Sequence, residues 1–158
     1  MYQFVIPLHH LNWSTRAILE GITNKYNPTQ IFLITSNDEI EKIKSFLSNW
    51  NVKNIELIDE DNFFVDKYGL SKENIFIKIN NNKPNYSPGW LYQQMIKLGS
   101  PDVIKELSDT FVVWDSDLLP VNSWPLVDNG KEKFALLQDN SSGLSLIHIS
   151  EPTRHERI

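Results

Sequence analysis

Two aspartates one residue apart close the apolar run 111–114, within the segment TFVVWDSDLLP at 110–120. Carboxylates this close repel each other, so Asp115 and Asp117 are costly at the end of a strand unless a cation binds between them. Magnesium and manganese prefer oxygen ligands and often combine one or two carboxylates with substrate phosphates. The segment therefore predicts a Mn²⁺ or Mg²⁺ site at Asp115 and Asp117. A solvated turn with two surface aspartates is the alternative.

The chain ahead of this segment alternates apolar runs with stretches of helical periodicity. The predicted elements are strands at 3–6, 30–35 and 54–59 and helices at about 12–26 and from 36 onwards. Ser36 and Glu39 have the spacing of a capping box at the start of the second helix. This β-α-β-α-β order is typical of a parallel sheet with helices on both faces. We expect an α/β, Rossmann-like fold in a single domain.

The middle of the chain is less regular. Residues 60–88 lack a clear period and contain the polar patch NNNKPNYSP, so we predict a long loop there. A helix is expected at 89–98, and a second one is expected to start with Ser100 as its N-cap. The expected buried face of the helix at 89–98 consists of Leu91, Met95 and Leu98.

Two further strands complete the predicted sheet. One is the apolar run 111–114, and the other is KFALLQ at 133–138. In open α/β sheets, ligands bind at the carboxyl ends of the strands. That rim would bring together the residues 7–10, 35–37, 59–61 and 115–117.

Composition limits the class of protein. The 158-residue chain has a net charge of −5, contains no cysteine and is 41% apolar. An acidic chain without a basic stripe is poorly suited to phosphate backbones, so we expect no nucleic-acid partner. The lack of cysteine excludes disulfides and thiolate metal sites. No apolar run is long enough for a transmembrane segment and no basic leader precedes the first one, so we expect a cytoplasmic protein, with peripheral membrane association left open.

The body of the chain, about 2–139, resembles GT-A glycosyltransferases, whose D-x-D motif binds a metal and a nucleotide-diphospho-sugar donor. The resemblance rests on FVIPLHH followed by a helix, on GWLYQQMIKL, and on FVVWDSDLLP. The second of these is similar to a segment found before the D-x-D strand in bacterial members linked to surface polysaccharides. The resemblance implies a metal-dependent transferase that moves a sugar to a hydroxyl acceptor in polysaccharide or glycan synthesis.

The resemblance also assigns roles to residues. Asp117 would coordinate the metal directly, whereas Asp115 would bind it through water or contact the donor's ribose. Lys97 would meet the diphosphate oxygens or, equally well, be a solvated helix residue. The donor-binding residues that the resemblance implies are Pro7, His9, Ser36, Asn37, Trp90, Gln93, Gln94, Lys97 and Asp115. The acceptor-binding half of the family pattern, with any general base, is missing.

The end of the chain has a resemblance of its own. LSLIHISEPTR at 144–154 matches the in-frame translation of a transposase adapter used in DNA libraries. We therefore expect 1–143 to be the N-terminal, nucleotide-sugar-binding part of a single GT-A domain, truncated at its C-terminus. Residues 144–158 would be a non-native read-through tail.

Two other functions fit parts of the pattern. A non-catalytic α/β nucleotide-binding module would keep the cleft but transfer nothing. An aspartate-nucleophile phosphatase also places a D-x-D after an apolar strand, but in that family the motif lies close to the N-terminus and continues with a small residue and a hydroxyl. Here Leu118, Leu119 and Pro120 follow instead.

Several other side chains have a chemical and a structural interpretation. Neighbouring residues on an extended chain point in opposite directions, so His9 and His10 are not expected to share a metal. The acidic run 59–61 is expected to cap a helix rather than contact the donor, and Arg16 to lie on a helix surface. The tryptophans expected to serve mainly in packing are Trp13, Trp50, Trp114 and Trp124.

Overall fold

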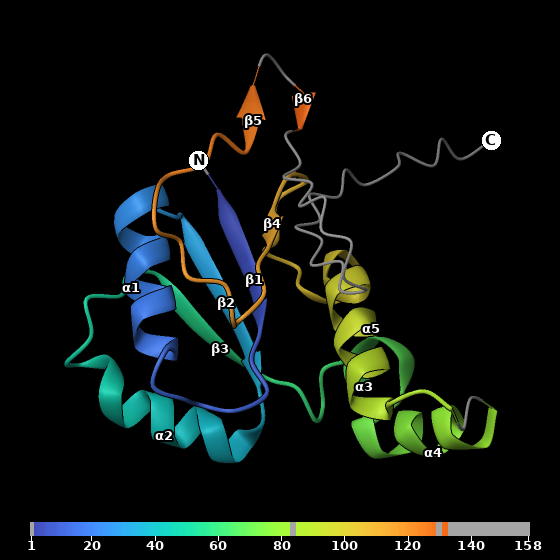
Figure 1. Cartoon of the computed structure of the whole chain (residues 1–158). Helices are drawn as coiled ribbons and strands as arrows, with labels where there is room; N and C mark the ends of the chain where they lie inside the picture. Colours follow the sequence, from blue (N-terminus) through green and yellow to red (C-terminus); the bar gives the residue numbers. More distant parts are fainter. Residues whose placement is uncertain (1, 83–84, 129–130, 133–158) are drawn as a thin grey trace.

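The computed structural model of the chain describes residues 2–82, 85–128 and 131–132 (Figure 1). Its centre is a four-stranded, all-parallel sheet in the order β3-β2-β1-β4. The strands are β1 (Gln3–Pro7), β2 (Gln30–Thr35), β3 (Ile55–Asp59) and β4 (Val112–Val113). The predicted α/β, Rossmann-like fold is confirmed. The predicted strand at 133–138 and the tail at 144–158 lie outside the described residues.

The strand order places a switch point beside β1. The chain runs outward from β1 to β2 and β3, and then returns to the opposite side of β1 to form β4. Val5 therefore pairs with Phe32 on one side and Val113 on the other. A short β-hairpin, β5 (Val127–Asp128) with β6 (Lys131–Glu132), follows the sheet. Crevices at the carboxyl ends of strands next to such a reversal are the usual ligand sites of open α/β sheets.

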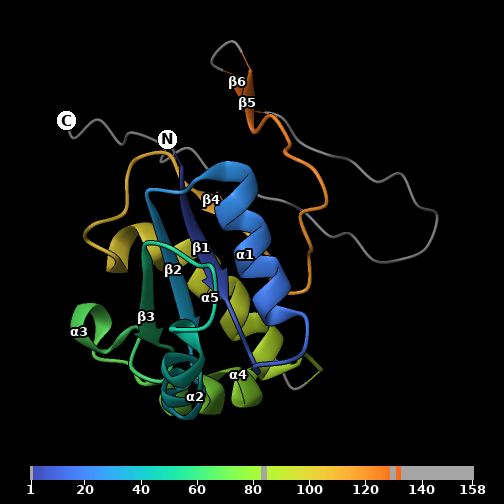
Figure 2. The same cartoon turned by 90° about the vertical axis from the view of Figure 1, so that its left-hand side faces the viewer.

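Two helices cover one face of the sheet. They are α1 (Thr15–Tyr26) and α2 (Asn37–Leu47), and Figure 2 shows α1 lying along the strands. Phe4 and Ile6 point toward this face and pack with Ile18 and Ile22 of α1. The start of α1 is fixed by Asn12, whose Oδ1 accepts the N–H groups of Ser14 and Thr15 at 2.9 and 3.2 Å.

Three helices cover the other face, namely α3 (Val65–Tyr68), α4 (Lys72–Asn82) and α5 (Pro88–Val103) (Figure 1). Val5 and Phe32, which alternate with the side chains of the first face, pack here with Tyr92 and Ile96 of α5. β1 and β2 are thus buried on both faces, which explains why they read as continuous apolar runs. Among the described residues, no helix has the length and apolar character needed to cross a membrane.

The predicted long loop at 60–88 is wrong, because this stretch contains α3 and α4. The Ser71 hydroxyl accepts the N–H of Asn74 at 3.3 Å and so caps the start of α4. Ile75 is the only fully buried side chain of α4 within the described residues, with Phe76 and Ile79 packed beside it. The helix period was hidden because the apolar residues of α4, at 75, 76, 77 and 79, lie close together instead of recurring every three or four positions, and its last residues are asparagines.

The expected break near Ser100 is also wrong, because α5 continues to Val103. The Ser100 hydroxyl donates to the carbonyl of Ile96 at 2.6 Å instead of capping a new helix. Pro101 lies in the last turn, where its missing N–H costs a single helical hydrogen bond. The buried face of α5 consists of Tyr92, Ile96 and Ser100, whereas Met95 and Leu98 of the predicted face are 38% and 79% exposed.

The tryptophans divide into two groups. Trp114 is buried and Trp50 packs against the core, as predicted. Trp13 is 94% exposed and Trp124 is 45% exposed, so the packing role predicted for these two is wrong. Trp13 precedes the first residue of α1, which places it outside the helical face that meets the sheet.

Candidate functional site

A cleft of about 460 Å³ opens at the carboxyl end of β1, next to the switch point of the sheet. Its walls come from the residues after β1, from α4 and from the first turns of α5. The predicted donor-binding residues that line it are Pro7, His9, Trp90 and Gln93. The α4 residues of this lining, Lys72 and Phe76, were not among the residues expected from the sequence.

Other predicted donor-binding residues lie elsewhere. Ser36 and Asn37 stand at the end of β2, where the Asn37 side chain donates to Asp59 at 3.1 Å. They and Gln94 are not part of the cleft lining. The structure thus places Ser36 and Asn37 on the same rim but not in the same cavity.

The two aspartates follow β4 on a tight turn. The N–H of Trp114 donates to the carbonyl of Val5 at 3.0 Å, so β4 stays paired with β1 until one residue before Asp115. The N–H of Leu118 then donates to the Asp115 carbonyl at 3.1 Å, and the Trp114 indole donates to the Leu118 carbonyl at 2.8 Å. This turn leaves Asp115 partly buried at the rim and Asp117 exposed.

The segment after the turn is anchored on α1. Pro120 packs so closely on Gly21 that a Cβ at this glycine would lie 2.9 Å from the proline ring. Further on, the N–H of Trp124 donates to the Tyr26 hydroxyl at 3.0 Å. The turn that carries Asp115 is therefore held by the sheet on one side and by α1 on the other.

Lys97 connects α5 to this turn. Its ammonium group forms an ion pair with Oδ1 of Asp115, and the two side chains are 13% and 23% exposed. Trp90, Gln93 and Lys97 are spaced i, i+3 and i+7, which puts them on one face of α5. This face leads from the cleft to Asp115. Trp90 and Gln93 line the cleft, whereas Lys97 and Asp115 lie outside its lining.

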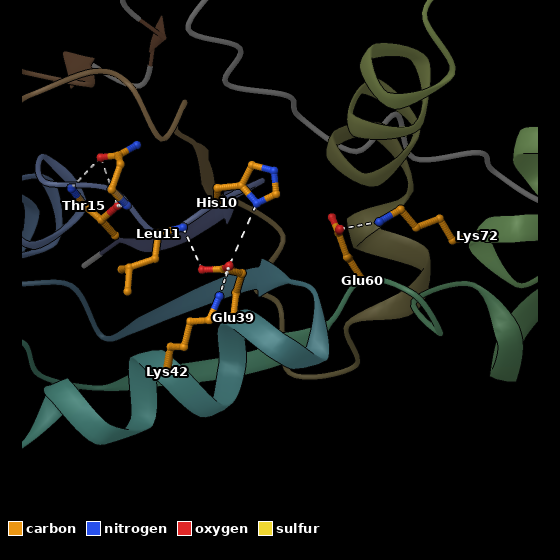
Figure 3. Close-up of polar contacts among 8 residues, drawn as sticks. His10, Leu11, Thr15, Glu39, Lys42, Glu60 and Lys72 are labelled. Atoms are coloured by element: carbon orange, nitrogen blue, oxygen red, sulfur yellow. Dashed lines mark hydrogen bonds and ion pairs between the residues drawn. The ribbon is translucent and has the colours of Figure 1, made fainter.

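The floor of the cleft carries a second lysine with two carboxylates. Lys72 Nζ lies 2.5 Å from Glu60 Oε1 and 3.1 Å from Asp61 Oδ1, and Figure 3 shows the first of these pairs. The same ammonium lies 5.8 and 5.9 Å from the ring centroids of Phe76 and Tyr92. Burial alone would lower the pKa of Lys72, but the hydrogen bonds to the two carboxylates outweigh it and raise that pKa. Lys72 is therefore a permanent cation at neutral pH.

Tyr92 completes this floor. Its hydroxyl is buried and donates to the backbone carbonyl of Glu60. Burial, together with the charge of Glu60, raises the pKa of Tyr92 well above its ordinary value. The hydroxyl is therefore a hydrogen-bond donor at any physiological pH. The spacing of Lys72 and Phe76, i and i+4, was the available signal for these two residues of the cleft, and it becomes visible only if 72–82 is interpreted as a helix.

The loop after β1 is fastened by Glu39 of α2. The N–H of Leu11 donates to Glu39 Oε2 at 2.9 Å, and Lys42 donates to Oε1 at 2.8 Å (Figure 3). These contacts hold the pKa of Glu39 below its ordinary value, with the Lys42 hydrogen bond as the largest cause. The predicted capping box is wrong, because the Ser36 hydroxyl makes no cap hydrogen bond and the Glu39 carboxylate is used by the loop.

The two histidines do not point in opposite directions as expected. Their ring centroids are 3.9 Å apart, because the chain bends at His9 and His10 and the alternation of a strand no longer applies. His9 lines the cleft, and His10 Nδ1 is 3.9 Å from Glu39 Oε1. Arg16 pairs with Glu20 at 2.8 Å on the surface of α1, as predicted.

The acidic run after β3 has two roles. Asp59 orders the loop, since it accepts the N–H of Asp61 at 2.9 Å and the side-chain amide of Asn62 at 2.7 Å. Glu60, by contrast, lines the cleft. Within 2–82, 85–128 and 131–132, no group of three or more histidine or acidic side chains is placed to hold a metal.

A family model matches residues 17–148, which is most of the chain, and it is described as a family of unknown function, DUF6492. The chain belongs to the DUF6492 family. The match includes Asp115, Asp117 and the α4 and α5 walls of the cleft. No curated protein and no solved structure matches the chain. Membership in DUF6492 therefore assigns no activity, and the site has to be interpreted from its chemistry.

Proposed function

We propose that this DUF6492 protein is a metal-dependent glycosyltransferase of the GT-A type. It would move a sugar from a nucleotide-diphospho-sugar to a hydroxyl acceptor in bacterial polysaccharide or glycan synthesis. The observation that carries the proposal is the position of Asp115, which leaves the sheet at its switch point beside the cleft. Carboxylates at that position are suited to a phosphate-bearing ligand that arrives with a metal ion.

The donor set fits a hard cation. Asp115 and Asp117 supply only carboxylate oxygens, and the exposed Asp117 leaves room for ligands from outside the protein. These two residues would hold Mn²⁺ or Mg²⁺, which neutralises charge on a diphosphate leaving group. The bond that forms joins the acceptor oxygen to the anomeric carbon, and the bond that breaks joins this carbon to the diphosphate.

The charges of the site favour different positions for the diphosphate and for the uncharged part of the donor. At the floor of the cleft one ammonium group, Lys72, is shared by Glu60 and Asp61, so this end offers no free positive charge to a phosphate. The diphosphate is better placed beside Lys97. The cleft then receives the uncharged part of the donor, with the half-exposed Trp90 offering a ring face and the Glu60 and Lys72 pair offering hydrogen bonds to hydroxyls.

The experiment is a binding and turnover measurement with a panel of nucleotide sugars. We expect calorimetry to detect binding in Mn²⁺ but not in EDTA, together with slow donor hydrolysis. Asp117→Ala should remove the metal-dependent binding, whereas Asp109→Ala, at an exposed aspartate ahead of β4, should not. Binding that ignores Mn²⁺ and Asp117 would refute the proposed function. Binding without hydrolysis or transfer would favour a non-catalytic nucleotide-binding module.

A further inference from the structure

The ion pair between Lys97 and Asp115 has well-fixed partners. Lys97 lies between Ile96 and Ser100, near the buried face of α5, and Asp115 lies in the hydrogen-bonded turn after β4. Both side chains are mostly shielded from water, at 13% and 23% exposure. Loose surface pairs cost side-chain entropy when they form, whereas a pair between two positioned groups costs less. Lys97 is therefore a standing counterion of Asp115.

The same carboxylate is one of the two that the proposed function gives to the metal. An ammonium ion and a divalent cation compete for a carboxylate, since each bound cation weakens the attraction for the next. Lys97 should thus weaken metal binding in the absence of a substrate. A diphosphate changes the balance, because it offers the ammonium group new anionic oxygens within reach of its flexible four-carbon chain.

We propose that Lys97 couples metal binding to diphosphate binding by exchanging partners. This coupling rests on the proposed function. In the free protein Lys97 holds Asp115 and keeps the affinity for metal low. When a diphosphate enters beside α5, Lys97 binds it and releases Asp115 to the metal. By linkage, the metal then raises the affinity for diphosphate by the same factor. The exchange would prevent the protein from holding metal tightly when no donor is present.

The test measures the coupling directly, without relying on activity. Mn²⁺ binding is followed by calorimetry, first alone and then with saturating inorganic pyrophosphate, with correction for the complex that the two form in solution. The variant Lys97→Met removes the charge and keeps most of the side-chain length. Lys97→Arg keeps the charge, and Lys105→Met is a control at an exposed lysine just after α5.

We expect Lys97→Met to bind Mn²⁺ alone about fivefold more tightly than the wild type, the factor expected when an ion pair of this kind no longer competes. The gain in Mn²⁺ affinity on adding pyrophosphate should shrink in this variant. Lys97→Arg and Lys105→Met should behave like the wild type. Lys97→Gln repeats the test if the methionine variant does not fold, as judged by thermal unfolding.

Two outcomes separate this inference from the proposed function. If Asp117→Ala removes Mn²⁺ binding but neutral variants of Lys97 bind Mn²⁺ no better than the wild type, the metal site stands and the exchange is refuted. Lys97 would then be a structural tether between α5 and the turn after β4. If no variant shows Mn²⁺ binding that depends on Asp117, the proposed function fails, and the exchange fails with it.

Discussion

Two lysines border the candidate site, and they are balanced differently. Lys72 is shared by two carboxylates and lies 5.8 and 5.9 Å from two aromatic ring centroids, so its charge is more than compensated and several groups fix its position. Lys97 has a single carboxylate partner in the part of the chain that the structure describes, and a second aspartate stands two residues beyond that partner. We therefore expect the contacts of Lys72 to persist when a ligand binds. Lys97, by contrast, can exchange Asp115 for a phosphate when a cation and a phosphate bind.

The largest expected effect is on metal-dependent binding, and it distinguishes Asp117 from Glu60. Asp117→Ala should weaken Mn²⁺-dependent pyrophosphate binding about 100-fold, or roughly 2.7 kcal/mol, because it removes half of the protein's carboxylate ligands. Glu60→Gln should leave this binding within about twofold, since Glu60 belongs to the other end of the site. Calorimetry with pyrophosphate measures both variants. Equal losses in the two would show that the site is not divided as proposed.

The second effect is on stability, where we expect the substitution of Lys72 to matter more than that of Lys97. Lys72→Met should lower the free energy of unfolding by about 2 kcal/mol, because the carboxylate of the buried Glu60 loses its ammonium partner. Lys97→Met should cost less than about 1 kcal/mol, because Asp115 is 23% exposed and can turn to water. Denaturant unfolding of both variants, with Lys105→Met as the control, gives the comparison. A larger loss for Lys97→Met than for Lys72→Met would contradict it.

The third effect concerns the aromatic wall. Trp90 is 55% exposed at the cleft, so Trp90→Ala should change stability by less than about 0.5 kcal/mol. A ring or base that stacks on it would lose about 1 kcal/mol of binding, close to fivefold in affinity for a nucleotide sugar. Pyrophosphate has no ring and should bind as before. Trp13→Ala, at a more exposed tryptophan outside the cleft lining, is the matched control.

The sequence was most informative where burial dictates the pattern. Strands covered on both faces must be continuously apolar, which is why 3–6 and 30–35 could be located within a residue of β1 and β2. The partly exposed β3 was also located within a residue, at 54–59. The prediction missed α4 for the opposite reason. Among the described residues this helix buries one side chain fully, so its sequence carries little periodic signal. The face of α5 was also misassigned, since Leu98 is apolar and yet 79% exposed.

Polar partners could be predicted only in part. Asp115 was singled out by its place after an apolar strand and Lys97 by the family resemblance, but their ion pair depends on how α5 packs beside β4, which no local spacing encodes. Glu39 shows the limit more sharply. Its distance from Ser36 along the chain suggested a local cap, but the backbone N–H of Leu11, far away in sequence, was the group that needed an acceptor.

Glu39 provides the smallest effect and extends the comparison to a third carboxylate. It anchors the loop that carries His9 and His10, with Lys42 and His10 as the charged or titratable groups facing it. The hydrogen bond from Lys42, followed by that from the Leu11 N–H, holds the folded-state pKa of Glu39 below the ordinary value of 4.5. The unfolded chain therefore takes up a proton at a higher pH than the folded chain does. The stability that Glu39 contributes is present above pH 4.5 and is lost as the pH falls through the folded pKa.

Replacement of the Glu39 carboxylate should flatten the acidic part of the profile of unfolding free energy against pH. Between about pH 6 and about pH 3, the wild type should lose more unfolding free energy than Glu39→Gln, whose amide does not titrate. At neutral pH the variant should be less stable by about 1 kcal/mol, the usual net contribution of one intramolecular hydrogen bond. Glu41→Gln is the control, because Glu41 is exposed and pairs only with Lys44 among the described residues. Parallel profiles for the wild type and Glu39→Gln would mean that the loop after β1 is held by its backbone and not by this acid.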